Sequence, residues 1–200
     1  LMALATGEGR VAMSKAAKAE KYLRKPELTN LLTAQAAEMT GDKRKAQEVY
    51  RRLVSDDRTR FVGVRGMMKH KLEEGDTETA LKLAEKAFAI KPAHVEMQDT
   101  LLQLQAKNED WSAARKTLSA KLKHGAIPRD VHKRRDAILA LSEAKGVFEE
   151  GATIEAQEAA IDANKKSPDL IPAAVMASDE YVRRGKARQA TRVLKKAWNA

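Results

Sequence analysis

Four histidines are the first residues of this sequence that could do chemistry, because imidazole is a common ligand of metals and of haem iron. They are His70, His94, His124 and His132. No two of them have the close helical spacing of a ligand pair. The chain contains no cysteine, which excludes thiol nucleophiles, Cys-based zinc sites and haem-attachment motifs. We therefore interpret the histidines as surface residues and expect neither a metal site nor a cofactor.

Carboxylate pairs are the second candidates, since two carboxyl groups can act as general acid and base. The pairs are residues 73–74 and 149–150, all four of them Glu. Catalysis would require burial in opposed environments, whereas both pairs fall at the ends of predicted helices, where solvation explains them. The sequence also contains no phosphate-binding loop, serine-centred elbow or dinucleotide fingerprint. We predict that the protein is not an enzyme.

Basic side chains are the strongest chemical signal, because the net charge of +10 favours acidic partners. One cluster comprises Lys121, Lys123, Arg129, Lys133, Arg134 and Arg135, and residues 181–200 hold seven Lys or Arg and no acid. RNA is one such partner, although aromatic residues that could stack on bases are only 4% of the chain. Anionic lipid head groups are another. The charge alone leaves acidic proteins, lipid and nucleic acid open, with nucleic acid disfavoured.

An internal repeat defines the elements that carry these side chains. Turn residues recur at intervals of 34, at Gly7, Gly41, Gly75 and Glu109. Gly151 and Gly185 are again 34 apart, but the step from 109 to 151 is 42, so one unit is 8 residues longer. Alanine stands five residues after every one of these turn markers, at Ala12, Ala46, Ala80, Ala114, Ala156 and Ala190. A small residue at this point lets the two helices of a hairpin lie close together.

The residues after each marker follow the spacings of 4 and 3 that define one helical face. These spacings predict second helices over 10–24, 43–54, 77–90, 111–122, 153–165 and 187–198. First helices are predicted over 27–40, 60–74, 94–107 and 171–184, with a longer one over 129–150 that absorbs the insertion. Pro92 and Pro168 lie 17 residues past their markers, where a second helix should stop. We expect the larger residue four positions after the alanine to fill the gap between neighbouring helices.

This pattern resembles the tetratricopeptide repeat, which has the same period and the same order of Ala, large residue and Pro. The resemblance implies an all-α fold, an α-α superhelix (a TPR-like solenoid of helical hairpins). We expect one repeat domain over 1–200, with units at about 1–26, 27–60, 61–94, 95–128, 129–170 and 171–200. The first helices lack the aromatic and Leu-Gly signature of the strongest repeats, so a general helical-hairpin solenoid is the alternative.

The first helices of this repeat class line a concave groove, so their exposed positions are candidates for partner binding. Arg65 and Lys69 lie one helical turn apart in one unit. We expect this pair to hold an acidic group of a partner peptide, with glutamines of adjacent units donating hydrogen bonds. The alternative is a solvated basic face. The full candidate set is Arg65, Lys69, Gln35, Gln103, Asp99 and Lys145.

Several segments also resemble the proteobacterial HemY family, which is distinct from the flavin oxidase of the same name. The segments are residues 1–9, 32–37 with 41–42, 59–66, 108–114 and 195–198. The resemblance implies the soluble repeat domain of an inner-membrane protein that has N-terminal transmembrane helices. It also implies a link to late porphyrin and haem synthesis as a scaffold, with porphyrin-pathway enzymes as partners.

We therefore expect a non-catalytic protein–protein interaction scaffold, the soluble TPR domain of an inner-membrane protein linked to haem biosynthesis. The alternative is a soluble TPR adaptor that binds RNA or a secretion or assembly complex. Both ends cut the repeat, and no apolar run is long enough to span a bilayer, so we expect a soluble fragment of a membrane-anchored chain. Two upstream spans with the N-terminus inside, together with the basic surface, would place the domain in the cytoplasm.

Overall fold

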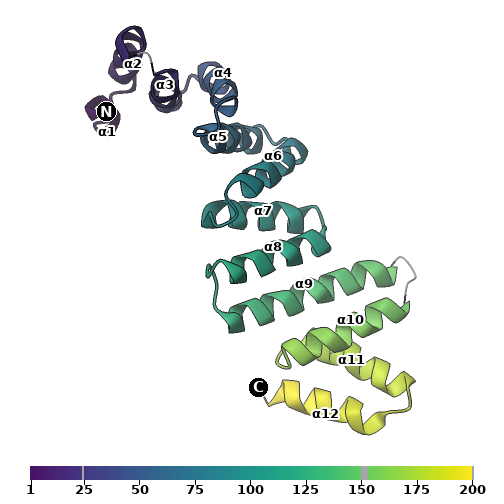
Figure 1. Cartoon of the computed structure of the whole chain (residues 1–200). Coiled ribbons are helices and arrows are strands. Elements are labelled where there is room, and N and C mark those ends of the chain that lie inside the picture. The colour runs from purple at the N-terminus through teal and green to yellow at the C-terminus, as the bar shows by residue number, and fades with distance from the viewer. Residues whose placement is uncertain (24, 150–152, 200) are drawn as a thin grey trace. The chain divides into compact units, whose positions relative to one another are not determined.

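The computed structural model describes residues 1–23, 25–149 and 153–199. These residues form helices and no strand, so the fold is all-α. The helices are α1 (Met2–Ala5), α2 (Gly9–Leu23), α3 (Pro26–Thr40), α4 (Lys43–Val54), α5 (Arg60–Glu73), α6 (Thr77–Ile90), α7 (Val95–Lys107), α8 (Trp111–Lys123), α9 (Arg129–Glu149), α10 (Thr153–Lys166), α11 (Ile171–Arg183) and α12 (Ala187–Trp198). Figure 1 shows them as a succession of helical hairpins in chain order.

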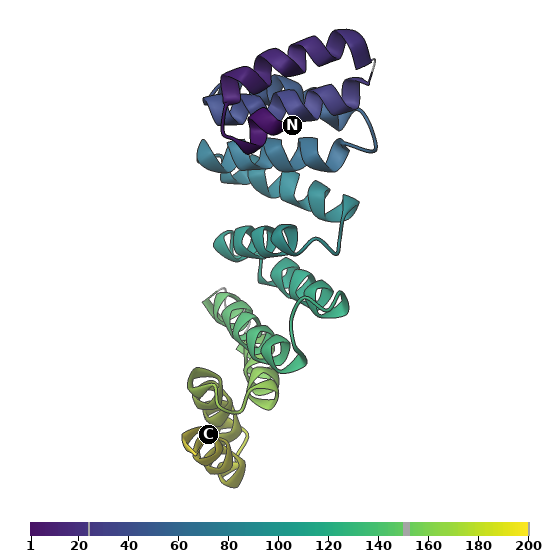
Figure 2. The same ribbon diagram turned by 90° about the vertical axis from the view of Figure 1, so that its left-hand side faces the viewer.

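The chain divides into two compact units, Leu1–Met97 and Gln98–Ala200. In the first unit α2 packs on α3, α3 on α4, α4 on α5 and α5 on α6; in the second unit α8 to α12 pack in the same consecutive way. Figure 2 shows the helices of each unit stacked in layers. Packing of each helix on its sequence neighbours is the arrangement of a helical-repeat protein, here of the TPR-like type. The assignment of all 200 residues to a single repeat domain stays a prediction.

The predicted helices begin and end within one residue of α2 to α12, apart from ends at 24 and 150, which lie outside the described residues. The predicted insertion is confirmed in α9, which has 21 residues where α7 and α11 have 13 each. Its eight extra residues therefore lengthen one first helix and leave the hairpin arrangement unchanged. The second helices α6 and α10 end two residues before Pro92 and Pro168, as predicted.

The turn markers share one backbone conformation. Five of them have positive φ, between 57° and 80°: Gly7, Gly41, Gly75, Glu109 and Gly185. Gly151 lies outside the described residues. The residue after the marker then caps the second helix in three consecutive units. The side chains of Asp42, Asp76 and Asp110 accept hydrogen bonds from backbone N–H groups of Lys45, Thr79 and Ala113 at 3.0, 3.1 and 2.9 Å. A left-handed turn residue followed by an Asp cap therefore starts α4, α6 and α8 at the repeat interval.

The alanines five residues after the markers are all buried, as the close approach of the hairpin helices requires. The same closeness explains two glycines of α5 that the sequence places three residues apart. A Cβ atom at Gly63 would lie 2.7 Å from the Tyr50 carbonyl oxygen, and one at Gly66 would lie 2.4 Å from the Tyr50 ring. Helix α5 can therefore approach α4 only because both positions lack a side chain.

Candidate partner-binding site

The first helices of neighbouring hairpins are joined by charged side chains in the first unit. Arg65 of α5 forms a bidentate ion pair with Glu96 at the start of α7, with Nη2 at 2.7 and 2.8 Å from the two carboxylate oxygens. The Arg65 side chain is 45% exposed and that of Glu96 is 53% exposed. Arg65 thus lies at the surface, as predicted for a partner-binding residue. Its guanidinium already holds an acidic group, however, and that group comes from the protein itself.

Lys69 lies one turn after Arg65 and faces the other neighbouring first helix. Its Nζ is 3.8 Å from a carboxylate oxygen of Glu38 on α3, and its side chain is 61% exposed. The Nε2 atom of the buried His70 lies 3.7 Å from the other oxygen of the same carboxylate. Burial raises the pKa of the nearby Tyr50 phenol, and a hydrogen bond to Glu38 raises it further. Glu38 therefore gathers a lysine, a histidine and a tyrosine around one carboxylate.

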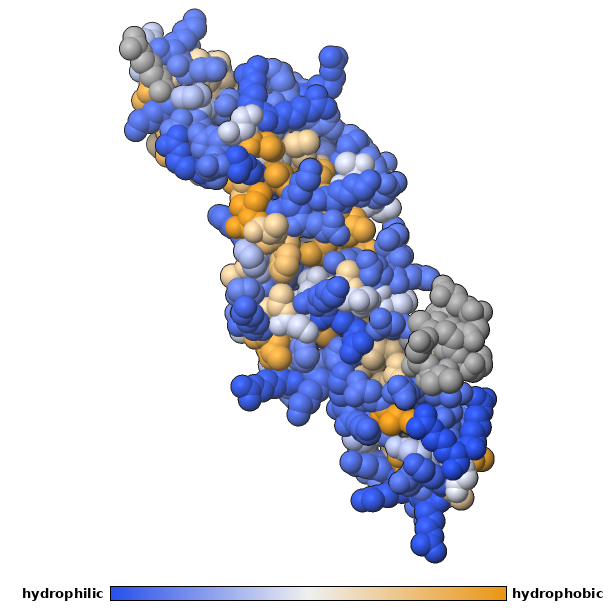
Figure 3. All heavy atoms as spheres, turned by 45° about the vertical axis from the view of Figure 1, so that its right-hand side comes forward, coloured by the Kyte–Doolittle hydropathy of each residue, from blue (hydrophilic) through white to orange (hydrophobic). Residues whose placement is uncertain are grey.

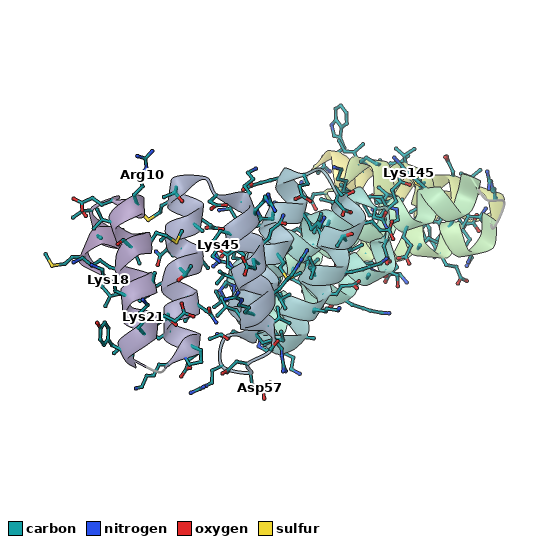
Figure 4. The ribbon with its side chains drawn as sticks, turned by 90° about the horizontal axis from the view of Figure 1, so that it is seen from above. Arg10, Lys18, Lys21, Lys45, Asp57 and Lys145 are labelled. Atoms are coloured by element: carbon teal, nitrogen blue, oxygen red, sulfur yellow. The ribbon has the colours of Figure 1, made fainter. Side chains whose placement is uncertain are left out.

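The remaining predicted site residues fall into two groups. Gln35, Gln103 and Lys145 are exposed on α3, α7 and α9, and Figure 4 labels Lys145. Asp99 is half-buried, because its carboxylate pairs with the ammonium group of the buried Lys121 of α8. This pair makes both residues part of the α7–α8 packing. Lys121 is consequently no part of the basic surface that the sequence predicted around the insertion.

The structure brings together only part of the predicted set. Arg65 and Lys69 share the exposed side of α5, and Gln35 lies on α3, which is linked to α5 through Glu38. Gln103, Asp99 and Lys145 belong to the second unit. The candidate site of the first unit therefore consists of two basic residues, each with an acidic neighbour from an adjacent first helix.

The interpretation of all four histidines as surface residues is wrong for His70. This side chain is buried, and its ring packs on Tyr50 with ring centroids 5.8 Å apart. His94 and His132 are half-buried, and His94 packs on Phe61 with centroids 4.9 Å apart. Only His124 is fully exposed. Aromatic neighbours explain the error, because the flat imidazole rings of His70 and His94 pack on the rings of Tyr50 and Phe61. The described residues hold no group of side chains that could bind a metal ion.

The first carboxylate pair is explained by the predicted solvation. Glu73 and Glu74 are both exposed, and Lys43 pairs with Glu73 at 3.1 Å. A hydrogen bond from Lys43 lowers the pKa of Glu73, and hydrogen bonds from Lys71 and Gln47 lower that of Glu74. Both carboxylates are therefore held in the charged form, which is unsuited to a general acid. The side chains of the pair at 149–150 lie outside the described residues.

One inward-facing position of the first helices escaped the sequence reasoning. The residue five positions before the turn marker is buried in α3, α5, α7 and α11, where it is Ala36, His70, Leu104 and Glu180. Two of these four residues are polar. The Glu180 Oε1 atom accepts a hydrogen bond from Arg184, whereas its buried Oε2 atom has no hydrogen-bond partner. Aligning the units at their markers would have shown this column as mainly apolar, with His and Glu as exceptions.

A cavity of about 200 Å³ opens beside Glu180, between α10 and α11. Alanines of α10 and Met176 of α11 form its apolar lining, and Gln157 and the exposed Asp179 and Arg183 also line it. The residue nine positions after the marker should fill the gap between helices, but here it is Ala160. The prediction of a larger residue is confirmed for the buried Tyr50 and Leu118, and fails at Ala16, Ala84 and Ala160.

A network of charges ties three helices together in the second unit. Asp136 of α9 accepts hydrogen bonds from Arg115 of α8 at 2.8 Å and from Lys166 of α10 at 2.6 Å. Burial alone would raise the pKa of Asp136, but the two hydrogen bonds outweigh it and lower the pKa. Arg134 of the predicted basic cluster pairs with Asp169. These contacts are structural, because every partner belongs to the same unit.

The positive charge of the chain is carried by the second helices. The helices α2, α4, α6, α8, α10 and α12 contain 21 Lys or Arg and 7 Asp or Glu, a net charge of +14. The first helices α3, α5, α7, α9 and α11 contain 11 of each, so their net charge is zero. Arg10, Lys18 and Lys21 project outward from α2 in Figure 4. On the face drawn in Figure 3, polar residues predominate and apolar residues surface in patches between them.

The fold and these surfaces define an all-α protein built of TPR-like hairpins. No protein-family model matches the sequence, and no curated protein matches it. Among solved structures, the chain is similar to YrrB, described as a TPR protein with an unusual peptide-binding site. The identity is 16%, the match covers 94% of this chain and 91% of YrrB, and the TM-score is 0.47.

Two further solved structures show a likeness of the same extent. MamA from Desulfovibrio magneticus RS-1 is 14% identical over 88% of this chain and 94% of MamA, with a TM-score of 0.41. BtubC from P. vanneervenii is 14% identical over 98% of this chain and 88% of BtubC, with a TM-score of 0.45. Within the described residues, no helix has both the length and the apolar character needed to cross a membrane.

Proposed function

We propose that this protein is a non-catalytic interaction module that binds an acidic segment of a partner protein on its first helices. The observation that carries the proposal is the pair Arg65 and Lys69, which stand one turn apart, exposed, on a rigid helix of the first unit. Rigid presentation of basic side chains at regular spacing suits recognition of carboxylates in an extended peptide. The exposed Gln35 on α3 supplies a neighbouring hydrogen-bond donor.

Two carboxylates of the protein itself compete with a partner for the two basic residues. Glu96 covers Arg65, and Glu38 lies near Lys69. An ion pair between half-exposed side chains contributes only about 0–1 kcal/mol. A partner carboxylate can therefore displace Glu96 at little cost, and the bidentate geometry already seen at Arg65 is the one that it would adopt. The internal pairs also keep this surface from attracting unrelated acidic proteins strongly.

Charge reversal tests the site. We expect Arg65→Glu with Lys69→Glu to weaken retention of partner proteins at least tenfold, because two attractive contacts become repulsive. Replacement of Glu96 by Gln should strengthen retention, since it releases the Arg65 guanidinium. The measurement is quantitative co-purification from native membranes followed by mass spectrometry. The matched control reverses Arg44 and Arg51, which are exposed on the second helix α4. Equal loss in the control, or none in the Arg65 and Lys69 variant, would contradict a first-helix site.

The biological context that we propose rests on the resemblance to the HemY family. It places the chain as the cytoplasmic repeat domain of an inner-membrane scaffold that gathers porphyrin-pathway enzymes. The co-purification experiment addresses this context separately from the site. Enrichment of porphyrin-pathway enzymes with the full-length protein would support it. Retained partners of another pathway would overturn the haem link and leave the interaction module in place.

The alternative function is an adaptor for RNA, and the net charge of +14 on the second helices favours it. Binding of a polyanion releases counterions, so the affinity for RNA should fall steeply as salt rises. In this test the variant Arg44→Glu with Arg51→Glu is the one expected to weaken RNA binding, because it lowers the positive charge of a second helix. RNA affinity that falls with salt and with this variant would favour the adaptor. A secretion or assembly complex would appear instead among the co-purified proteins.

A further inference from the structure

One exposed side of α5 carries an apolar residue as well as the two basic ones. Val62, Arg65 and Lys69 stand at positions i, i+3 and i+7, so their side chains share one side of the helix, which we call the α5 stripe. All three are exposed, whereas the neighbouring Phe61 and Val64 are buried. At a rise of about 1.5 Å per residue, the first charge lies about 4.5 Å beyond the apolar residue and the second charge about 6 Å further on.

A second exposed valine joins this stripe from the start of α7. Two contacts hold the two helices together there, namely the ring packing of Phe61 on His94 and the ion pair of Arg65. Val95 lies between the two α7 partners in sequence, just as Val62 lies between the two α5 partners. The two valines are 51% and 36% exposed, respectively. They therefore present apolar surface at the junction that the Arg65 ion pair closes.

Charge alone gives an outside segment little advantage at this junction. Glu96 already holds Arg65, and ion pairs between exposed side chains contribute little to binding. An acidic segment that only replaced Glu96 would exchange one such pair for another. The protein's own carboxylate leaves the side chains of Val62 and Val95 exposed, so their burial is an additional gain for a partner. A segment that covers the valines also excludes water from the ion pairs, which strengthens them.

The spacing of the α5 stripe fits an extended segment that lies along the helix. Alternate residues of an extended chain point to the same side and are about 6.6–6.8 Å apart. The steps of about 4.5 and 6 Å along α5 are somewhat shorter, and the long side chains of Arg65 and Lys69 reach over the difference. Adjacent acids would point to opposite sides of the segment, so only one of them could reach the stripe. An apolar residue and two acids at alternate positions therefore match the three residues of the stripe.

We propose that the α5 stripe and Val95 select an extended partner segment in which an apolar residue and two acidic residues occupy alternate positions. The apolar side chain covers the valines, the first carboxylate displaces Glu96 from Arg65, and the second carboxylate pairs with Lys69. This inference rests on the proposed function for its biological meaning, because it describes the partner that the interaction module would take. The preference of the surface for this pattern is a separate property, which short peptides can test.

The first experiment measures the affinity of the 200-residue chain for short labelled peptides with blocked ends, by fluorescence anisotropy. The matching peptide is Leu-Ser-Glu-Ser-Glu, tested in both chain directions. One comparison peptide has Ser in place of Leu, and the other, Leu-Ser-Ser-Glu-Glu, has the two acids adjacent. We expect the better direction of the matching peptide to bind about tenfold more tightly than either comparison, because it alone covers the valines and reaches both charges. Equal affinities, or tighter binding of a peptide whose acids are four residues apart as on a helix, would overturn the proposal.

Substitution of the valines tests the contact that selects the apolar residue. Val62→Ser should remove the preference for the peptide with Leu over the peptide with Ser, while the weaker binding of the acids remains. The matched control is Val182→Ser, at an exposed valine of α11, and it should leave the preference unchanged. If Val62→Ser keeps the full preference, the leucine binds elsewhere and the proposal is wrong. Val95→Ser provides the same test if Val62→Ser does not fold.

Charge reversal separates this inference from the proposed function. Arg65→Glu with Lys69→Glu should abolish binding of the matching peptide as well as retention of partner proteins. If retention depends on the two charges but the peptides show no preference, the interaction module stands and the alternating pattern is wrong. If the matching peptide binds as expected but retention does not depend on the two charges, the proposed function of this site is wrong. The alternating pattern then stands as a binding preference of the α5 stripe.

Discussion

Single residues decide how closely neighbouring helices approach in this chain. Gly66 and Tyr50 are the tightest example, because the tyrosine ring fills the space that a side chain on residue 66 would need. At the α10–α11 interface the relation is reversed, with Met176 opposite Ala160 and a cavity between them. The space at this repeat position can therefore be filled by a large residue from either helix.

Replacement of Gly66 by Ala tests this closeness. The added methyl group clashes with the Tyr50 ring, and overpacking of this kind costs about 1–3 kcal/mol, partly offset by about 1 kcal/mol of better helix propensity. We expect a lower free energy of unfolding in urea denaturation. The double variant Gly66→Ala with Tyr50→Leu should show a favourable coupling, since the shorter side chain makes room. Additive effects in this cycle would mean that the clash is relieved elsewhere.

At the scale of the helices, the second helices α4, α6, α8 and α12 begin after a turn marker, and the residue after the marker is the N-cap of each. An Asp cap begins α4, α6 and α8, whereas Lys186 stands at the same place before α12 and makes no side-chain cap. Helix α12 therefore begins without the side-chain hydrogen bond that α4, α6 and α8 have. Its first turn also carries no acidic residue to complement the helix dipole.

Replacement of Lys186 by Asp should supply the missing cap. The backbone N–H of Gln189 now donates to the Lys186 carbonyl oxygen at 2.9 Å. The new carboxylate would accept a hydrogen bond from this N–H, as Asp42 does from Lys45, and stabilise the chain by about 1 kcal/mol at most. Hydrogen exchange of the first turn of α12 measures the effect locally. Lys186→Ala serves as the control, because it removes the charge without adding an acceptor. Equal protection of the two variants would show that the gain comes from removing the positive charge.

How much the sequence predicts differs between apolar and charged positions. The helices, the marker turns and the buried alanines were all predicted from the 34-residue spacing. They are predictable because turn residues and small residues act on helices that are neighbours in the sequence. Charged residues were predicted less well. Asp99 and Lys121 were expected at the surface and pair with each other inside the α7–α8 hairpin. Arg65 is exposed, but its partner Glu96 lies 31 residues away in sequence, and no local spacing predicts such a pair.

The whole molecule gains stability from carboxylates that are held in the charged form. Hydrogen bonds or ion pairs lower the pKa of Glu48, Asp56, Glu73, Glu74, Asp76 and Asp136. In the unfolded chain these groups titrate at about 3.9 for Asp and 4.3 for Glu. Their contribution is therefore fully present above the unfolded values and is lost as the pH falls through the lower folded values. Among these groups, Asp136 is the one that joins three helices.

The variant Asp136→Asn isolates the contribution of Asp136 to the free energy of unfolding. At pH 7 we expect the variant to lose about 1–3 kcal/mol of unfolding free energy, because Arg115 and Lys166 lose their shared carboxylate. The difference from the unmodified chain should begin to shrink as the pH falls below about 4, where Asp136 is protonated in the unfolded chain, and should vanish only below the lowered pKa of the folded chain. Thermal unfolding at several pH values measures this trend. Asp130→Asn, at an exposed position of α9, is the control. A loss that is independent of pH would mean that the charge of Asp136 is not the cause.

The constant interval between turn markers has a consequence for how such a gene can change in length. Gly41 with Asp42 and Gly75 with Asp76 are the same turn and cap, 34 residues apart. Duplication or loss of the DNA between two equivalent turns would join a marker to a cap that already fits it. The new neighbours would again be a second helix and a first helix of the same kind. Recombination at these turns can therefore lengthen or shorten the chain in whole hairpins, with a new pair of helices only at the join.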